Sequence, residues 1–298
     1  MSSIPERTIG VVILNYKSYV DTETLVFELL SNKTKHRLII QIVDNASPND
    51  SFSYLWDKFK DVPDVYVNKN NENSGFACGN NFGLKLLAKY SPDYALVLNN
   101  DVHFDTSILD KLVTVYESIN NVGAVAPLQC YPSGQYDKRG LAIPNFINDF
   151  FSYTYIYYRL WRDSLDIVEN TDYKGVRKVG IIPGCFIFID YALFESIGFF
   201  SEDTFLFCEE RFLARKLKDI GRSNYLLLDC HFIHDHSKTI NDEASFLRQL
   251  GLLHDGRVAY TRRYRKFASL KVALLNLMWF YQSNRVKLIA FLRKNLFK

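Results

Sequence analysis

Polar residues with the chemistry of a ligand site follow three apolar runs of the sequence. "IGVVILNY" contains Asn15, "LIIQIVDNAS" contains Asp44 and Asn45, and "YALVLNND" contains Asn99 and Asp101. Burying a bare carboxylate is costly unless a cation or a hydrogen-bond donor meets it. Asp101 therefore either caps a helix or holds a metal ion, and the recurrence of the pattern favours a site.

The segment "NENSGFACGNNFG", residues 71–83, has the composition of a ligand-contacting loop. Gly75 and Gly79 allow a tight turn or a close approach of the backbone to a ligand. Asn73, Asn80 and Asn81 can hydrogen-bond a base, a ribose or a phosphate. The segment matches neither the dinucleotide fingerprint nor the P-loop. An Asn- and Gly-rich start of a helix is the alternative.

Two groups of ionisable residues lie in the second half of the chain. "FLFCEERFLARKL" places Glu209 and Glu210 where an amphipathic helix begins, either as catalytic acids or as acids that favour the helix dipole. "CHFIHDHSKT" contains His231, His234 and His236. Neutral imidazole suits Mn²⁺ moderately and Mg²⁺ poorly. These histidines are either metal or phosphate contacts or structural residues.

Strand-like and helix-like segments alternate through the first half of the chain, which predicts βαβ units and a parallel sheet. Ligands bind such sheets beyond the carboxyl ends of the strands, where the polar residues lie. The second half is less regular, with a strand, turn and helix over 181–200 and an amphipathic helix over 206–221. In the first half we expect strands at 9–16, 38–47, 65–70, 94–101 and 122–129, and helices at 21–32, 51–59, 76–90 and 107–118.

The composition of the 298 residues excludes some classes of protein. A net charge of +3 is too small to indicate a nucleic-acid partner. Five scattered cysteines without metal-site spacing indicate reduced, cytosolic thiols. The first ten residues lack the apolar core of a signal peptide, and no apolar stretch is long enough to span a bilayer. We therefore expect a cytoplasmic protein.

Four motifs in order, "VVILNY", "VDNAS", "NSGFACGNNFG" and "LVLNND", resemble glycosyltransferase family 2 in its rhamnosyltransferase-like branch. The resemblance extends over roughly residues 8–240. It implies the α/β GT-A fold, in which a mostly parallel nucleotide-binding sheet flanked by helices merges with an acceptor-binding half. It also implies inverting transfer of a sugar from a nucleotide diphosphate, with Mg²⁺ or Mn²⁺ bridging the diphosphate.

The resemblance implies roles for individual residues. Asp101 takes the place of the metal-binding aspartate that closes the DxD motif, whereas Asn99 departs from the first acid of that motif. Glu210 matches the general base, usually an Asp, and Glu209 matches the acid before it. The implied nucleotide contacts are Asn15, Tyr16, Asp44, Asn45, Asn73, Gly75, Phe76, Asn80 and Asn100. The other implied contacts are Pro183, Gly184 and Cys185 for donor sugar and acceptor, and His234 and His236 for the metal.

The C-terminal residues differ from the rest in charge. We expect a GT-A domain over 1–255, with its nucleotide-binding half at 1–128 and its acceptor-binding half at 129–255. Residues 256–298 form a basic amphipathic helical tail that suits an anionic membrane surface, with packing on its own domain or in a homodimer as the alternative.

The leading hypothesis is an inverting glycosyltransferase that uses dTDP-rhamnose or a UDP-hexose. Its acceptor is a lipid-linked oligosaccharide of bacterial surface polysaccharide synthesis, at the inner face of the cytoplasmic membrane. A non-catalytic assembly subunit that keeps the fold is one alternative. A sugar nucleotidyltransferase is another, but "NYKSYVDTET" lacks the glycine-rich phosphate loop that such an enzyme needs after its first strand.

Overall fold

The first half of the chain forms a parallel four-stranded sheet. The computed structural model describes residues 5–31, 33–137, 142–154, 174–235 and 243–296. These strands are rich in Val, Ile and Leu because helices cover both faces of the sheet. Their order is β3-β2-β1-β4, with all neighbours parallel. The strands are β1 (Thr8–Asn15), β2 (Arg37–Asp44), β3 (Val65–Lys69) and β4 (Tyr94–Asn99).

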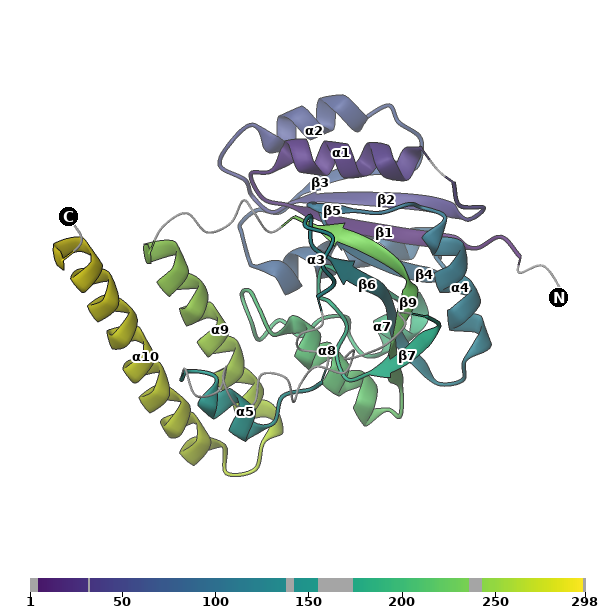
Figure 1. Cartoon of the computed structure of the whole chain (residues 1–298). Coiled ribbons are helices and arrows are strands. Elements are labelled where there is room, and N and C mark those ends of the chain that lie inside the picture. Colours follow the sequence, from purple (N-terminus) through teal and green to yellow (C-terminus); the bar gives the residue numbers. More distant parts are fainter. Residues whose placement is uncertain (1–4, 32, 138–141, 155–173, 236–242, 297–298) are drawn as a thin grey trace.

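Helices connect these strands and cover the sheet from two sides. Figure 1 shows α1 and α2 on one face and α3 on the other. The direction of the crossovers explains this placement. The chain moves from β1 outward to β3 and then returns across the sheet to β4. The helices are α1 (Tyr19–Leu30), α2 (Ser51–Phe59), α3 (Phe76–Leu87), the short η1 (Ala88–Tyr90) and α4 (Ile108–Ser118).

The second half extends the same sheet with antiparallel pairs and one parallel pair, β6 with β9. β8 pairs antiparallel with β4, and the strand order continues β8-β6-β9-β5. β5 pairs with the end of β9, and β7 pairs with the first half of β9. The backbone amide of Asn99 donates to the backbone carbonyl of Cys185 over 3.0 Å, which joins the two halves at the end of β4. The elements are β5 (Val102–His103), β6 (Val122–Cys130), α5 (Phe146–Phe151), β7 (Val176–Val179), β8 (Phe186–Asp190), α7 (Tyr191–Ser196), α8 (Glu209–Asp219) and β9 (Ser223–His234).

Two long helices, α9 (Glu243–Tyr264) and α10 (Ala268–Leu296), form a pair beside the sheet (Figure 1). A small apolar cluster of Tyr153, Val258, Val272 and Leu275 holds them to the α5 region. None of the helices in the described part of the chain is long and apolar enough to cross a membrane. The pair is therefore an attached helical hairpin with its own small core.

The α/β prediction with a C-terminal helical extension is confirmed. The predicted helix at 206–221 is α8. The boundary drawn between 255 and 256 falls inside α9. The division into domains stays a prediction.

Candidate active site

The ends of β1 and β2 are tied together by a buried hydrogen-bond network. The Asn15 amide donates to Asp44 Oδ2 over 2.8 Å, and Thr22 Oγ1 donates to Asn15 Oδ1 over 2.9 Å. Asp44 Oδ1 accepts the Ser47 amide over 2.9 Å. Asn15 and Asp44 are fully buried. Their side chains therefore fix the loops at the strand ends, and this network supplies the partners that a buried carboxylate requires.

The loop before α3 is fixed by asparagine contacts and by one glycine. Asn45 Nδ2 donates to Asn73 Oδ1 over 2.9 Å and to the Gly75 carbonyl over 3.2 Å. Gly75 has φ +90°, and a Cβ at this position would lie 2.2 Å from the carbonyl oxygen of Phe205. Only glycine fits here. The loop can therefore approach the segment before α8, where the Phe76 amide donates to that carbonyl over 2.8 Å.

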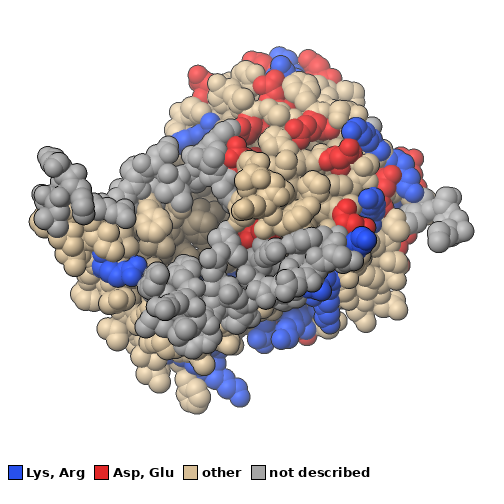
Figure 2. Space-filling model, in the orientation of Figure 1, with Lys and Arg blue, Asp and Glu red and all other residues tan. Residues whose placement is uncertain are grey.

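A cavity of about 420 Å³ opens between the β1–α1 loop, the start of α3 and the first turns of α9. Figure 2 shows the molecule hollowed between the C-terminal helices and the sheet. Lys17 and Arg248 line the cavity, and no Asp or Glu is among the described residues around it. It therefore favours an anionic ligand. This cationic cavity is lined by Leu14, Tyr16, Lys17, Asn45, Asn73, Gly75, Phe76, Phe205, Leu206, Arg248, Gln249 and Leu252.

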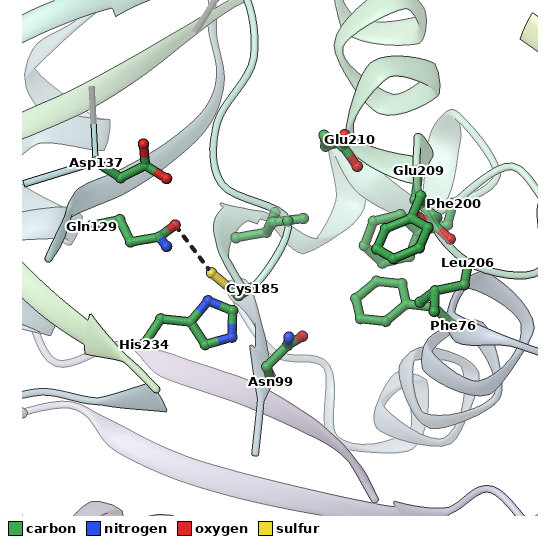
Figure 3. A pocket seen from close by; sticks show the side chains of 13 residues that line it. Phe76, Asn99, Gln129, Asp137, Cys185, Phe200, Leu206, Glu209, Glu210 and His234 are labelled. Carbon is green, nitrogen blue, oxygen red and sulfur yellow. Dashed lines mark hydrogen bonds between the residues drawn. The ribbon is translucent and has the colours of Figure 1, made fainter. Parts of the chain in front are cut away.

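A second cavity, of about 270 Å³, adjoins the first and has the opposite charge. It shares Phe76 and Leu206 with the cationic cavity, so the two spaces meet at these side chains. Figure 3 shows Glu209 and Glu210 on one side of it, with Asp137, His234 and Asn99 across the opening. This acidic cavity is lined by Phe76, Asn99, Gln129, Asp137, Gly184, Cys185, Ile187, Phe200, Leu206, Phe207, Glu209, Glu210 and His234.

Asp101 and His234 meet at the edge of the acidic cavity. His234 Nε2 lies 3.0 Å from Asp101 Oδ1, because β5 pairs with the end of β9. Asp101 Oδ1 is buried, and the His234 imidazole is the polar group that faces it. One carboxylate oxygen and one imidazole nitrogen at this spacing fit two ligands of a divalent cation. No group of three or more His, Cys, Asp or Glu in the described residues could complete such a site.

The turn before α8 stores backbone strain where the two glutamates begin the helix. Phe207 and Cys208 have φ of 74° and 73°, the left-handed region that costs L-residues about 1 kcal/mol or more each. Glu209 is 5% exposed, and burial together with the neighbouring Glu210 carboxylate raises its pKa to about 8. Burial also raises the pKa of Glu210. At neutral pH Glu209 is therefore mainly protonated.

The space in front of Glu210 is kept open by Gly184. A Cβ at position 184 would contact Glu210 Oε2 at 3.7 Å. Cys185 beside it is buried, and burial raises the pKa of its thiol well above the usual range. A thiol in this state is a poor nucleophile. The acidic cavity therefore offers a carboxylate for proton transfer and no activated thiol.

The start of α8 is held from behind by a buried carboxylate that binds arginines from two helices. Asp149 of α5 accepts two hydrogen bonds from Arg211 of α8, at 2.9 and 3.2 Å, and one from Arg265, the residue after α9, at 2.6 Å. Arg257 Nε lies 3.7 Å from the same carboxylate. Each of these arginine side chains is at most 15% exposed. Because Arg211 follows Glu210 directly, this network fixes the position of the glutamates.

α9 also touches the strained turn directly. A Cβ on Gly256 would lie 2.9 Å from Cys208 Sγ and 3.0 Å from the Phe207 carbonyl. α9 can therefore pack this closely only with glycine at position 256. The same helix lines the cationic cavity with Arg248 and Leu252. One helix thus contacts both the anion-favouring cavity and the turn that carries the glutamates.

The structure gathers most of the predicted site residues around the two cavities. Tyr16, Asn45, Asn73, Gly75 and Phe76 line the cationic cavity, and Gly184, Cys185, Glu209, Glu210 and His234 line the acidic one. Asn100 lies beside α1, where it donates to the Ser18 carbonyl and to Thr22. Asn80 donates to the Phe76 carbonyl within α3. Pro183 is not part of either described lining, and His236 lies outside the described residues.

Sequence reasoning missed Arg248, Gln249, Gln129 and Asp137. Of the three histidines in this segment the structure describes His231 and His234, and it separates them. His234 is buried at the site, whereas the ring of His231 packs edge-on against Tyr136. Alternation along an extended strand explains this difference between positions 231 and 234.

No family model matches the chain. It is 22% identical to the low-salt glycan biosynthesis hexosyltransferase Agl10 of Haloferax volcanii, over an alignment that covers 68% of this chain. The chain spans 59% of the length of that relative. The similarity therefore links the chain to a hexosyltransferase.

Solved structures share the fold. The mannosyltransferase PcManGT of Pyrobaculum calidifontis, in complex with GDP-Man and Mn²⁺, matches with a TM-score of 0.60 at 15% identity, over 98% of this chain and 76% of that one. GalNAc-T7 with UDP, GalNAc and Mn²⁺ matches with a TM-score of 0.59 at 13% identity, over 92% of this chain and 55% of that one. S. aureus TarS matches with a TM-score of 0.52 at 13% identity, over 97% of this chain and 73% of that one. The chain therefore has the GT-A fold of glycosyltransferases.

Proposed function

We propose that this chain is an inverting, metal-dependent glycosyltransferase that uses a nucleotide diphosphate sugar. The observation that carries the proposal is the pair of adjoining cavities with opposite charge, one with Lys17 and Arg248 and one with carboxylates. A nucleotide sugar has a matching polarity, because its diphosphate is anionic and its sugar is neutral. The similarity to the hexosyltransferase and to structures solved with nucleotide sugars supports this assignment.

The donor spans the two cavities in this proposal. Its base and phosphates occupy the cationic cavity, where the ring of Tyr16 and the amides of Asn45 and Asn73 offer stacking and hydrogen bonds. Its sugar passes Phe76 and Leu206 into the acidic cavity. Asn15 and Asp44 support the base-binding loops from below through their mutual hydrogen bond.

Asp101 and His234 hold the divalent cation, Mn²⁺ or Mg²⁺, in this proposal. Their facing oxygen and nitrogen, 3.0 Å apart, would supply two ligands to such a cation. When bound, the cation neutralises charge on the departing nucleoside diphosphate. Since the protein contributes few ligands, the affinity for free metal is weak until the donor is present.

Glu210 is the general base. The oxygen of the acceptor hydroxyl forms a bond to the anomeric carbon, the bond from that carbon to the diphosphate oxygen breaks, and the hydroxyl proton passes to the Glu210 carboxylate. A base with a raised pKa, as burial gives Glu210, accepts a proton more readily. Glu209 does not compete for this proton at neutral pH because it is already protonated.

The finer assignment follows the sequence resemblance. We propose dTDP-rhamnose or a UDP-hexose as the donor and a lipid-linked oligosaccharide of bacterial surface polysaccharide synthesis as the acceptor. Such an acceptor places the enzyme in the cytoplasm, peripheral to the inner face of the membrane. Gly184 and Cys185 border the space for the transferred sugar and contribute to its selection.

The test is turnover of a panel of dTDP-, UDP- and GDP-sugars with Mn²⁺, for wild type and for Glu210→Gln. Water replaces the acceptor as nucleophile, so release of nucleoside diphosphate reports the reaction without knowledge of the acceptor. We expect the variant to bind the preferred donor as wild type does and to lose at least a hundredfold in turnover. Equal turnover by both proteins would contradict the role of Glu210, and the absence of any donor binding by wild type would contradict the proposed function.

A further inference from the structure

The outer face of α10 presents a line of exposed, large apolar side chains. They are three or seven residues apart, except for one adjacent pair, Phe280 and Tyr281, and therefore lie along one side of the helix. Their exposed fractions run from 49% to 67%. In Figure 2 the outer face of the C-terminal helix, at the lower left, is largely free of charged residues. This apolar stripe consists of Leu270, Leu277, Phe280, Tyr281, Leu288 and Phe291.

The stripe is a second apolar face, in addition to the face that packs on the protein. Val272 and Leu275 of α10 are buried in the cluster that joins the helix to α9 and α5. Trp279 stacks on His254 of α9, with ring centres 5.3 Å apart. The inner side of α10 therefore packs on the protein. A helix with one filled apolar face and a second exposed one has surface left for an apolar partner.

The charge around the stripe identifies the partner. Residues 256–298 contain no Asp or Glu. Arg257, Arg263 and Arg265 bind acids within the protein, whereas Lys266 and Lys287 are exposed and form no ion pair with the described residues. A second copy docked on the stripe would place cations against cations. An anionic lipid surface instead complements both the apolar stripe and its cations.

We propose that the apolar stripe of α10 docks on an anionic lipid bilayer, with the helix lying in the plane of the membrane surface. The 29 residues of α10 extend for about 43 Å at 1.5 Å per residue, along which the stripe runs on one side only. The aromatic and leucine side chains enter the boundary between headgroups and acyl chains, and the flanking lysines contact anionic headgroups. Lipid docking does not depend on the proposed transfer reaction.

Docking in this orientation places the active site near the membrane. α9 packs on the inner face of α10 and lines the cationic cavity with Arg248 and Leu252. The helical pair therefore stands between the bilayer and the cavities.

The test is co-sedimentation of the full chain with vesicles of phosphatidylcholine alone or mixed with phosphatidylglycerol. The stripe variant carries Leu277→Asn, Phe280→Asn and Leu288→Asn. The matched control carries Val20→Asn and Trp56→Asn, which are 58% and 47% exposed on α1 and α2. We expect wild type and control to bind the anionic vesicles at least tenfold better than the neutral ones, and the stripe variant to lose at least tenfold of that binding.

Two further readouts keep the result interpretable. Circular dichroism and thermal unfolding confirm that the stripe variant is folded, as expected because the altered side chains are exposed. Light scattering in solution reports the mass of each protein. Unchanged vesicle binding by the stripe variant would overturn the proposal, and so would a wild-type dimer that the stripe substitutions convert to a monomer. Donor turnover without vesicles, which should be equal in all three proteins, separates this test from that of the proposed function.

Discussion

Replacing Glu209 with Gln should change how stability depends on pH. In the native protein the Glu209 carboxyl has a pKa of about 8, whereas its ordinary value is 4.5. Between these values the native state retains a proton that the unfolded chain has released. Stability therefore falls as pH rises through this interval, and the whole loss is present above pH 8. Gln is neutral at every pH and has nearly the same shape, so the variant lacks this loss.

The size of the effect follows from the interval between the two pKa values. At 1.36 kcal/mol per pKa unit, the free energy of unfolding of wild type falls by at most on the order of 5 kcal/mol over this interval. Relaxation of the structure and entry of water reduce it, so we expect Glu209→Gln to be about 2–5 kcal/mol more stable than wild type at pH 8.5. At pH 4.5 the Glu209 carboxyl is protonated in the native state and about half protonated in the unfolded chain, so the difference in stability should be close to zero there.

Urea unfolding at several pH values between 4.5 and 8.5 measures this difference directly. Glu72→Gln is the matched control, because Glu72 is exposed in the loop before α3 and lines neither cavity in the described structure. The control should follow the wild-type curve. Parallel curves for Glu209→Gln and wild type over the whole range would refute the assignment of a protonated, buried Glu209.

Three other substitutions test the parts that position the site. Gly256→Ala should push α9 away from Cys208, lower the free energy of unfolding by about 1–3 kcal/mol and reduce turnover, as measured by urea unfolding and product release. Asp149→Asn should lower stability by about 3–5 kcal/mol, since buried arginines lose their carboxylate. Arg248→Ala should raise the KM for the donor about tenfold and leave kcat nearly unchanged, because the lost contact is with the bound phosphates.

Each of these substitutions has a control in the same chain. Gly251→Ala alters the same helix, but its Cβ would meet only Trp279, at 3.8 Å, and stability should change little. Asp219→Asn removes an exposed partner of Arg215 and should cost less than about 1 kcal/mol. Arg262→Ala removes an exposed cation of α9 outside both described cavities. A control that behaves like its test variant would contradict the corresponding role.

The parallel half of the fold and the residues at its strand ends could be predicted from sequence. Apolar runs that stop at Asn15, Asp44 and Asn99 are local patterns, and parallel strands bring their carboxyl ends to one edge. The motif order then indicated the GT-A fold, which the solved structures confirm. The local sequence patterns therefore correctly identified the segments that form the parallel half of the sheet.

The contributions of α9 could not be predicted in this way. Arg248 reaches the cationic cavity only because the helix packs across the start of α8, and nothing in the surrounding sequence indicates that contact. The same is true of the Asp149 network, whose members are far apart in the chain. The protonation of Glu209 depends on burial by the tertiary structure, which the sequence around two adjacent glutamates does not indicate.

The most direct test of the proposed chemistry is a calorimetric titration with UDP, dTDP and GDP, with and without Mn²⁺, for wild type and Asp101→Asn. We predict that Mn²⁺ strengthens binding of the preferred nucleotide to wild type at least tenfold and has little effect on the variant, because Asp101 with His234 holds the cation against the diphosphate. Equal strengthening by Mn²⁺ in both proteins would contradict this account.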